Sequence, residues 1–382
     1  MPSTTALASL AVGLAALQGV QAGFDNTSSS NVAVYWGQNS YGQSSGNLTQ
    51  QRLAYYCNNT DIDIIPLAFM TAISDSTGHP QLNFANQGDK CSTFNGTQLL
   101  NCPELATDIP LCQQTYNKTI LLSIGGATYT EGGFATADAA VTAADMIWAA
   151  FGPPPTNTTN TTTTTLRPFG AAQVDGFDFD FESTVSNISP FAARLRTLMD
   201  TVEAGDGRHR LLTAAPQCPY PDAADDAFLS GTGAVPMDAV FVQFYNNYCG
   251  VQSFVPGAAE QNNFNYATWD EWARTEAANA GEVKVFVGVP GGQGAAGSGY
   301  LAAGELEPVL EFVGGGYGAS FGGVMVWDAS QAVANGGFLG EVKGELVALE
   351  GGEAEAEAEV EVEVCGGGYG GRTAWRGVEF RA

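Results

Sequence analysis

One eight-residue stretch, DGFDFDFE at residues 175–182, restricts the possible folds and functions of this chain more than any other. Its acidic residues Asp178, Asp180 and Glu182 alternate with phenylalanines. Successive side chains of a β-strand point to opposite faces, so the acids line one face and the rings the other. Crowded carboxylates raise one another's pKa, which can keep one carboxyl protonated as a general acid. The stretch therefore predicts a buried strand carrying acid–base chemistry.

Two other interpretations of this stretch are weaker. A solvated strand face is disfavoured because apolar residues precede the acids, and unpaired acids are costly in a buried strand. A metal site is disfavoured because the carbonyl and imidazole ligands that usually complete one are missing nearby. With only two histidines, His79 and His209, a histidine-based triad is also disfavoured. We expect neither a metal nor a cofactor.

The charge and the first residues constrain the compartment and the partners. A net charge of −26 argues against nucleic acids and anionic membranes as partners. Residues 1–22 resemble a signal peptide, because an apolar run ends in the small-residue pattern Val20–Ala22. That run is too short to anchor the protein, and no later segment is long enough to span a bilayer. We therefore expect a secreted, extracellular protein, either free or associated with a cell wall.

Glycosylation motifs and cysteines favour the same compartment. The seven cysteines of an exported chain imply disulfides, although spacing alone leaves their pairing open. The chain has N-glycosylation motifs at Asn26, Asn47, Asn58, Asn95, Asn117, Asn157, Asn160 and Asn187.

The apolar segments predict the architecture. Eight short segments alternate with helical stretches, which indicates parallel βαβ units and a single (β/α)8 TIM barrel, an α/β fold. Such barrels carry their chemistry at the C-terminal ends of the strands. A doubly wound open sheet is the alternative, but no GxGxxG follows the first strand. The expected strands are 31–36, 62–69, 119–123, 174–181, 211–215, 239–245, 283–289 and 323–327.

Composition divides the rest of the chain. We expect one catalytic domain over residues 23–346, interrupted by a Pro/Thr/Asn-rich surface insertion at 152–169. Residues 347–382 are acidic and glycine-rich, and we expect a tail without stable structure there. A long loop is expected from residue 70 to about 102. The expected helices are 50–57, 135–151, 191–203, 266–280 and 306–312.

Four motifs, in the same order, resemble those of glycoside hydrolase family 18. The stretch at 175–182 resembles the DGxDxDxE signature, and SIGG at 123–126 resembles the SxGG strand of that family. YWGQN at 35–39 and QFYNN at 243–247 resemble class III, hevamine-like chitinases of plants and fungi. The resemblance spans about residues 31–345. It implies a TIM-barrel endochitinase, a monomer that hydrolyses chitin or N-acetylglucosamine oligomers.

The resemblance also implies roles for individual residues. Glu182 would be the general acid, and Asp180 would orient the 2-acetamido group of the substrate. Asp178 would pair with Asp180, with support from Ser123, and Tyr245 would hydrogen-bond the acetamido carbonyl. The remaining substrate contacts would come from Gln38, Phe69, Asn83, Gly126, Gln243, Asn246 and Trp327, the last forming the floor under the −1 sugar.

The family's cysteine order implies three disulfides and leaves Cys365 over. The implied pairs are Cys57–Cys112, Cys91–Cys102 and Cys218–Cys249. Two features depart from the minimal plant enzymes, namely the insertion just before the acidic strand and the acidic tail.

Two other functions remain open at this stage. A catalytically silent lectin or inhibitor would usually have lost one of the acids, whereas this chain keeps all three. An endo-β-N-acetylglucosaminidase acting on N-glycans would share the acids, but the class III motifs favour chitin. For the mechanism we expect retention of the anomer. Asp180 lies on the same strand face as Glu182, so the acetamido oxygen of the substrate is better placed than Asp180 to attack.

Overall fold

The computed structural model describes residues 23–155 and 165–365, with side chains up to residue 352. The expected signal peptide, the middle of the expected insertion and the last part of the expected tail lie outside the described residues. Within these limits, no helix is both long enough and apolar enough to cross a membrane.

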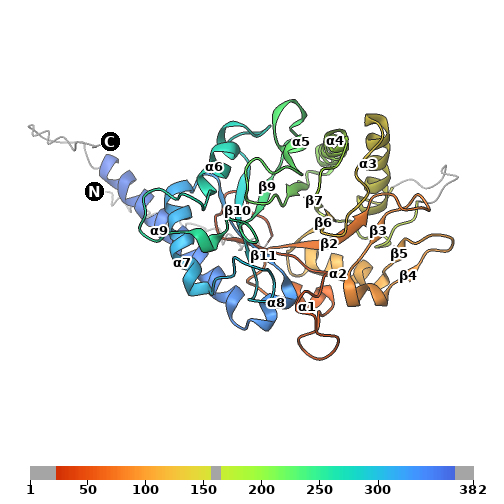
Figure 1. The fold of residues 1–382 in the computed structure, drawn as a ribbon, viewed down its shortest axis with the longest axis horizontal. Coiled ribbons are helices and arrows are strands. Elements are labelled where there is room, and N and C mark those ends of the chain that lie inside the picture. Colours follow the sequence, from red (N-terminus) through yellow and green to blue (C-terminus); the bar gives the residue numbers. More distant parts are fainter. Residues whose placement is uncertain (1–22, 156–164, 366–382) are drawn as a thin grey trace, which may run out of the picture.

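A closed barrel of parallel strands forms the centre of the molecule (Figure 1). Neighbouring strands pair in parallel around the ring, and the pair Ala33 and Ile64 closes it between the first two strands. The predicted (β/α)8 barrel is therefore confirmed. Its strands are β1 (Asn31–Val34), β2 (Ile64–Ala72), β6 (Thr119–Gly125), β7 (Gly176–Asp180), β8 (Leu211–Ala214), β9 (Ala239–Gln243), β10 (Lys284–Pro290) and β11 (Phe321–Trp327).

Helices surround the barrel, as Figure 1 shows for α3, α4 and α5 on one side and α7 and α9 on the other. The expected helices all have counterparts, but α2 was not predicted, because prolines at Pro103 and Pro110 obscure its pattern. The helices are α1 (Leu53–Cys57), α2 (Pro103–Gln114), α3 (Ala137–Phe151), α4 (Ile188–Asp206), α5 (Asp226–Leu229), α6 (Tyr266–Thr275), α7 (Ala303–Tyr317), α8 (Ala329–Ala334) and α9 (Phe338–Cys365).

The segment between β2 and α2 is more ordered than the long loop that we expected. A short strand, β3 (Gln81–Leu82), pairs antiparallel with β2. A 3-10 helix (Ala85–Lys90) and a small hairpin follow, formed by β4 (Ser92–Thr93) and β5 (Leu100–Asn101). Two shorter 3-10 helices lie at Gly231–Gly233 and Val251–Ser253.

The alternation in β7 divides its side chains between two cores, as predicted. Phe177, Phe179 and Phe181 are buried in the layer between the barrel and its helices. The ring centroid of Phe179 lies 5.2 Å from that of Phe228 in α5 and 6.1 Å from that of Phe191 in α4. A second, smaller apolar cluster, which includes Tyr35, Phe241 and Phe286, fills the barrel interior. The acids of β7 point into this interior.

Helix α9 extends past residue 346, where we expected the tail to begin. It continues through Cys365, across the Glu/Ala-rich segment. Alanine and glutamate are strong helix formers, so the repeat can extend a helix that packing has already started. Val342 and Leu346 provide that start, because both are fully buried.

Three disulfides have the pairing that the resemblance implied. Cys57–Cys112 joins α1 to α2, and Cys91–Cys102 joins the 3-10 helix at 85–90 to the start of α2. Cys218–Cys249 joins the segments that follow β8 and β9. All three therefore tie connecting segments to one another, and two of them hold the region that precedes β6.

Candidate active site

The acid row, by which we mean Asp178, Asp180 and Glu182, begins inside the barrel with Asp178. This carboxyl is 0% exposed and accepts three hydrogen bonds from hydroxyl groups. Tyr35 Oη and Ser123 Oγ donate to Oδ2 at 2.7 and 2.6 Å, and Thr213 Oγ1 donates to Oδ1 at 2.7 Å. Burial raises the pKa of Asp178, while the three hydroxyls oppose that shift. The three donors stabilise a carboxylate without supplying any positive charge.

Asp180, at the end of β7, is 5% exposed and has a different environment. Its Oδ1 accepts one hydrogen bond of 2.9 Å, from Gln243 Nε2. Burial raises the pKa of Asp180 well above its usual range, and the nearby charges of Glu182 and Asp178 raise it further. The described hydrogen bonds include none between Asp178 and Asp180, and the two carboxyls affect each other through like-charge repulsion.

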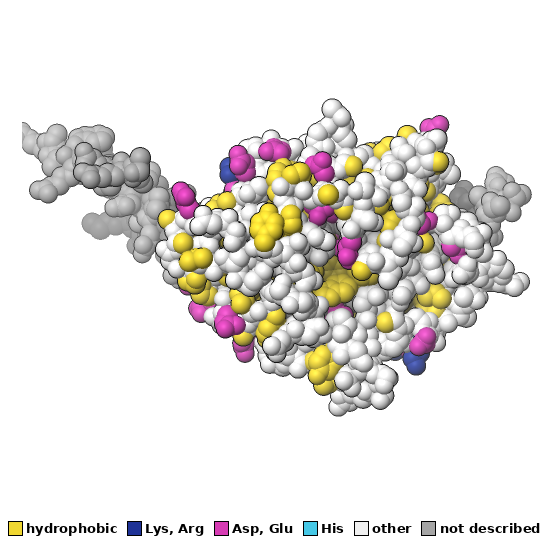
Figure 2. Space-filling view, viewed as in Figure 1, with side chains coloured by type: hydrophobic (Ala, Val, Ile, Leu, Met, Phe, Trp, Pro, Cys, Tyr) yellow, Lys and Arg dark blue, Asp and Glu magenta, His cyan; other side chains and the backbone are white. Residues whose placement is uncertain are grey.

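Glu182 lies two residues past the end of β7, where its side chain reaches solvent. Partial burial of the carboxyl raises its pKa, which favours the protonated form. Figure 2 shows a hollow near the middle of the molecular face, with hydrophobic side chains at its base and acidic side chains at its edge. The acid row thus runs from a buried, hydrogen-bonded carboxyl to one that can meet a ligand.

Tyrosine and tryptophan side chains surround the row. Tyr245, just past β9, is 7% exposed, and burial together with Asp180 and Glu182 raises the pKa of its hydroxyl well above the usual range. The hydroxyl therefore keeps its proton and can donate it to an acceptor. Trp327, at the end of β11, stacks on Phe69 with ring centroids 5.7 Å apart and an angle of 19°. These rings form an apolar surface in the same strand-end region as the row.

Two glycines allow this close packing. Gly125 ends β6 at φ +126°, and a Cβ there would lie 2.2 Å from the carbonyl oxygen of Asp180. A Cβ on Gly126 would lie 2.6 Å from the ring of Phe69. The GG pair at the end of β6 therefore lets the backbone approach the acid row and leaves room for the aromatic ring. Gly126 shapes the site through its missing side chain.

Four of the predicted substrate contacts are side-chain amides. In each of them, one amide atom already forms a hydrogen bond within the protein. Gln38 Nε2 donates to the carbonyl oxygens of Ala68 and Asn83, at 2.8 and 3.0 Å. Gln243 Nε2 donates to Ala215 O as well as to Asp180. The Oδ1 atoms of the two asparagines accept backbone N–H groups, of Ala85 for Asn83 and of Gly297 and Ser298 for Asn246.

Sequence reasoning missed the roles of Tyr35 and Thr213. Tyr35 belongs to a motif that we had noticed, but its hydroxyl was not assigned to Asp178. Thr213 is the one hydroxyl residue in the otherwise apolar strand β8, a position at which its side chain is fully buried. A polar residue in a buried strand needs a partner, and that signal could have identified it.

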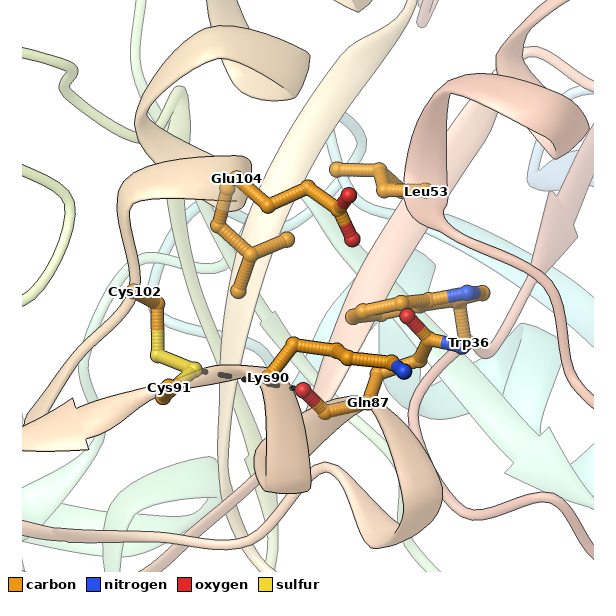
Figure 3. A pocket seen from close by; sticks show the side chains of 8 residues that line it. Trp36, Leu53, Gln87, Lys90, Cys91, Cys102 and Glu104 are labelled. Carbon is orange, nitrogen blue, oxygen red and sulfur yellow. Dashed lines mark hydrogen bonds between the residues drawn. A yellow bond between two sulfur atoms is a disulfide. The ribbon is translucent and has the colours of Figure 1, made fainter.

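Two cavities adjoin the 3-10 helix at 85–90. The cavity in Figure 3, beside the Cys91–Cys102 disulfide, has a volume of only about 10 Å³, which is room for about one water molecule. A polar cavity of about 520 Å³ adjoins Asn83 and is lined by Thr71, Gln81, Thr128 and Thr130. The second cavity has the size and polarity for a sugar. Among the described residues, no group of three His, Cys, Asp or Glu side chains could hold a metal ion.

Comparisons with known proteins identify the family of this chain. Residues 31–299 match the model of the family "Glycosyl hydrolases family 18". The chain is 46% identical over 348 residues to a class III chitinase of Arthroderma benhamiae, covering 91% of this chain and 95% of that protein. It is also 46% identical to Endochitinase 33 of Trichoderma harzianum, covering 91% of this chain and 100% of the relative.

One similar protein of known structure is named as an inhibitor of other enzymes. The xylanase and alpha-amylase inhibitor protein of Scadoxus multiflorus is 28% identical, with a TM-score of 0.62, over 82% of this chain and 98% of that one. The family model and the two fungal relatives each cover more than two thirds of the chain. This protein therefore belongs to family 18 of the glycosyl hydrolases.

Proposed function

We propose that this protein is a secreted, endo-acting chitinase that hydrolyses β-1,4 linkages between N-acetylglucosamine units. The observation that carries the proposal is the intact acid row, in which Asp178 is held by three hydroxyls and Glu182 reaches solvent. The names of the two fungal relatives support chitin as the substrate. Three disulfides support an extracellular location, after removal of residues 1–22. The proposed catalytic domain acts as a monomer.

In the proposed mechanism, Glu182 donates its proton to the glycosidic oxygen while the bond to the anomeric carbon breaks. The raised pKa of Glu182 supports this role, because it favours the protonated form before reaction. The acetamido carbonyl oxygen of the −1 sugar attacks the anomeric carbon and forms an oxazolinium ion. Glu182 then removes a proton from water, which attacks the same carbon and restores the acetamido group, so the β-configuration is retained.

Asp180 and Tyr245 would hold the acetamido group for that attack. Both side chains are nearly buried, and the charge of Asp180 raises the pKa of the Tyr245 hydroxyl, which supports their proximity. The Tyr245 hydroxyl would donate to the acetamido oxygen, and Asp180 would face the nitrogen, whose positive charge increases as the oxazolinium forms. Trp327 would lie beneath the apolar face of the −1 sugar, supported by Phe69.

The anchored amides would recognise the neighbouring sugar units. Because the Nε2 atoms of Gln38 and Gln243 are engaged, their Oε1 atoms would accept hydrogen bonds from the substrate. Asn83 and Asn246 would instead donate through Nδ2, since their Oδ1 atoms already accept. The polar cavity beside Asn83 would extend the cleft toward further sugar units.

One assay tests the reaction and the substrate together. The purified protein is incubated with chitin oligomers and, separately, with a high-mannose glycoprotein, and proton NMR follows the first-formed anomer. We expect cleavage of the oligomers to β-products, with no cleavage of fully deacetylated chitosan, which lacks the acetamido nucleophile. Release of the N-glycan would instead indicate an endo-β-N-acetylglucosaminidase. An initial α-product would contradict the substrate-assisted mechanism, and inactivity on every substrate would favour a lectin or an inhibitor.

A further inference from the structure

The side chain of Gln50 lies between two segments that each carry a predicted substrate contact. One segment follows β1 and contains Gln38, and the other follows β3 and contains Asn83. Gln50 ends the exposed loop that begins at Asn39, yet only 1% of Gln50 itself is exposed. The proposed mechanism gives this residue no role. A buried polar side chain needs hydrogen-bond partners, so the partners of Gln50 show what it holds in place.

The amide oxygen of Gln50 holds the first segment. Its Oε1 accepts the N–H groups of Gly37 and Asn39, at 2.9 and 3.0 Å. These two residues flank Gln38 in the chain, so the backbone is held on both sides of that substrate contact. The loop closes at the same place, because Asn39 Oδ1 accepts the backbone N–H of Gln50 at 2.9 Å. One oxygen atom therefore fixes the backbone from which the Gln38 side chain extends.

The amide nitrogen of Gln50 holds the second segment. Its Nε2 donates to Phe84 O and to Asn86 Oδ1, both at 3.2 Å. The backbone oxygen of Gln50 accepts from Asn86 Nδ2 at 2.9 Å and from Gln87 Nε2 at 2.8 Å. Phe84, which is fully buried, directly follows Asn83 in the chain. The second segment is therefore held beside its own substrate contact.

The two substrate contacts also meet directly. Gln38 Nε2 donates to the backbone oxygen of Asn83 at 3.0 Å. Gln50 spans the same two segments and fixes the backbone next to both ends of that bond. The spacing between the Gln38 and Asn83 side chains thus depends on a third residue, which is itself buried.

We propose that Gln50 is a positioning residue for substrate binding, which holds the amides of Gln38 and Asn83 at a fixed spacing. The inference rests on the proposed function, in which Gln38 Oε1 accepts from the sugar chain and Asn83 Nδ2 donates to it. An acceptor and a donor that are held in advance need no ordering when the chain arrives, which lowers the cost of binding. Gln50 bonds to neither the acid row nor Tyr245, so it acts on binding and leaves the chemical step unchanged.

Gln50→Met tests this proposal, because methionine has a similar length and shape but cannot replace these hydrogen bonds. The matched control is Gln113→Met, the same substitution at a partly buried glutamine near the N-terminal ends of the strands. Gln113 Nε2 also donates to two oxygens, Gln173 O at 2.9 Å and Asp175 Oδ2 at 2.8 Å, but it holds no predicted substrate contact. Both variants and the wild type are compared by urea unfolding and by initial rates on a chitin hexamer.

The kinetic constants separate positioning from a purely structural role. In Gln50→Met the KM for the hexamer should rise by about fivefold, which corresponds to one hydrogen bond, while kcat stays within about twofold. A rise in KM without a change in kcat shows that binding was lost equally from the ground state and the transition state. Gln113→Met should lower stability and leave KM unchanged. An unchanged KM in Gln50→Met, or a fall in kcat alone, would overturn the positioning role.

Hydrogen exchange tests the positioning without any substrate. Loss of the Oε1 acceptor should speed exchange at the amides of Gly37 and Asn39 by about tenfold, as measured by mass spectrometry of peptides that cover them. Gln113→Met should leave this exchange unchanged. Unchanged exchange in Gln50→Met would overturn the proposal. Faster exchange in a protein that cleaves no chitin oligomer would instead contradict the proposed function and leave the positioning of the two segments standing.

A milder variant carries the test if Gln50→Met does not fold. Asn86→Ala removes the two hydrogen bonds between Asn86 and Gln50 and leaves those of Gln50 to Gly37, Asn39 and Phe84 in place. Its KM for the hexamer should rise by about twofold, again with kcat unchanged. A KM equal to that of the wild type would count against the proposal in the same way.

Discussion

Buried acids have opposite surroundings at the two ends of the barrel: those at one end have cation partners and those at the other end do not. At the N-terminal ends of the strands, Asp63 pairs with Lys343 at 2.7 Å and accepts the N–H of Val32 at 2.8 Å. Asp175, just before β7, pairs with Arg208. At the C-terminal ends lie the acid row, Asp222 and Asp225, and no ion pair reaches any of these five within the described residues.

This difference separates a stabilising arrangement from a reactive one. Removing one partner of a buried ion pair destabilises the fold, whereas crowded, unpaired acids raise one another's pKa and destabilise it when ionised. Proteins retain such acids where a reaction needs them. Arg208 and Lys343 thus lie at the end of the barrel where no reaction is proposed, in a chain that carries only 14 lysines and arginines against 40 acids.

The largest expected effect comes from removing the exposed member of the acid row. Glu182→Gln should lower the turnover of chitin oligomers by about 10²–10⁴-fold, because the general acid is lost. Its stability should be unchanged or higher, since the variant removes a carboxyl whose pKa burial raises. Kinetics and urea unfolding measure the two properties, with Glu260→Gln, at an exposed position, as the control. A near wild-type rate would show that another group supplies the proton.

A substitution at the N-terminal end of the barrel should instead lower stability and leave turnover unchanged. Asp63→Ala leaves Lys343 without its partner and Val32 without its acceptor, so we expect a loss of about 3–5 kcal/mol in the free energy of unfolding. The turnover number should stay close to that of the wild type. A double variant with Lys343→Met should lose less than the sum of the two single losses, because the pair acts together. Additive losses would show that the two residues stabilise the fold independently.

How much of this contrast could be predicted from the sequence depends on the kind of pattern involved. The period-two alternation of β7 predicted which side chains enter the barrel, because backbone geometry alone decides it. The pairing of Asp63 with Lys343 brings together residues 280 positions apart, and only the closed fold creates that contact. The burial of Asp225 could not be predicted from the sequence for another reason. In sequence, Asp225 and Asp226 are two adjacent acids in a polar segment, and packing alone decides that one is buried and the other exposed.

A smaller effect is expected at Glu345, an acidic side chain outside the proposed site that forms no ion pair with the residues the structure describes. Burial, with Glu307 and Glu341 nearby, raises the pKa of Glu345 to about 7. Its folded pKa exceeds the unfolded value, so it costs stability above about pH 4.5 and increasingly up to about pH 7. Glu345→Gln should therefore stabilise the protein by about 1 kcal/mol at pH 8, since solvent screens part of the shift, and by nothing at pH 4.

Thermal or urea unfolding at these two pH values checks the Glu345 prediction, with Glu311→Gln on the exposed face of α7 as the control. Activity should not change in either variant. An equal gain at both pH values would point to better helix packing and away from charge.

The smallest expected effect concerns His209, which supplies a positive charge at the N-terminal end of β8 only when it is protonated. His209 lies between Asp238 and Glu203, with ring nitrogens 2.6 and 2.9 Å from their carboxylate oxygens. The hydrogen bond to Asp238 is the main cause that raises the pKa of His209 to about 9, although burial opposes the shift. Because the folded pKa exceeds the unfolded value, the stabilisation is complete below about pH 6.5 and disappears as pH rises through about 9.

The side chain is half exposed, so His209→Gln should cost only about 0.2–1 kcal/mol at pH 6, and nothing at pH 10. Urea midpoints at pH 6, 8 and 10 measure this difference. A cost that stays constant over that range would mean that His209 stabilises the fold by packing. The N-terminal end of the barrel would then not depend on the charge of His209.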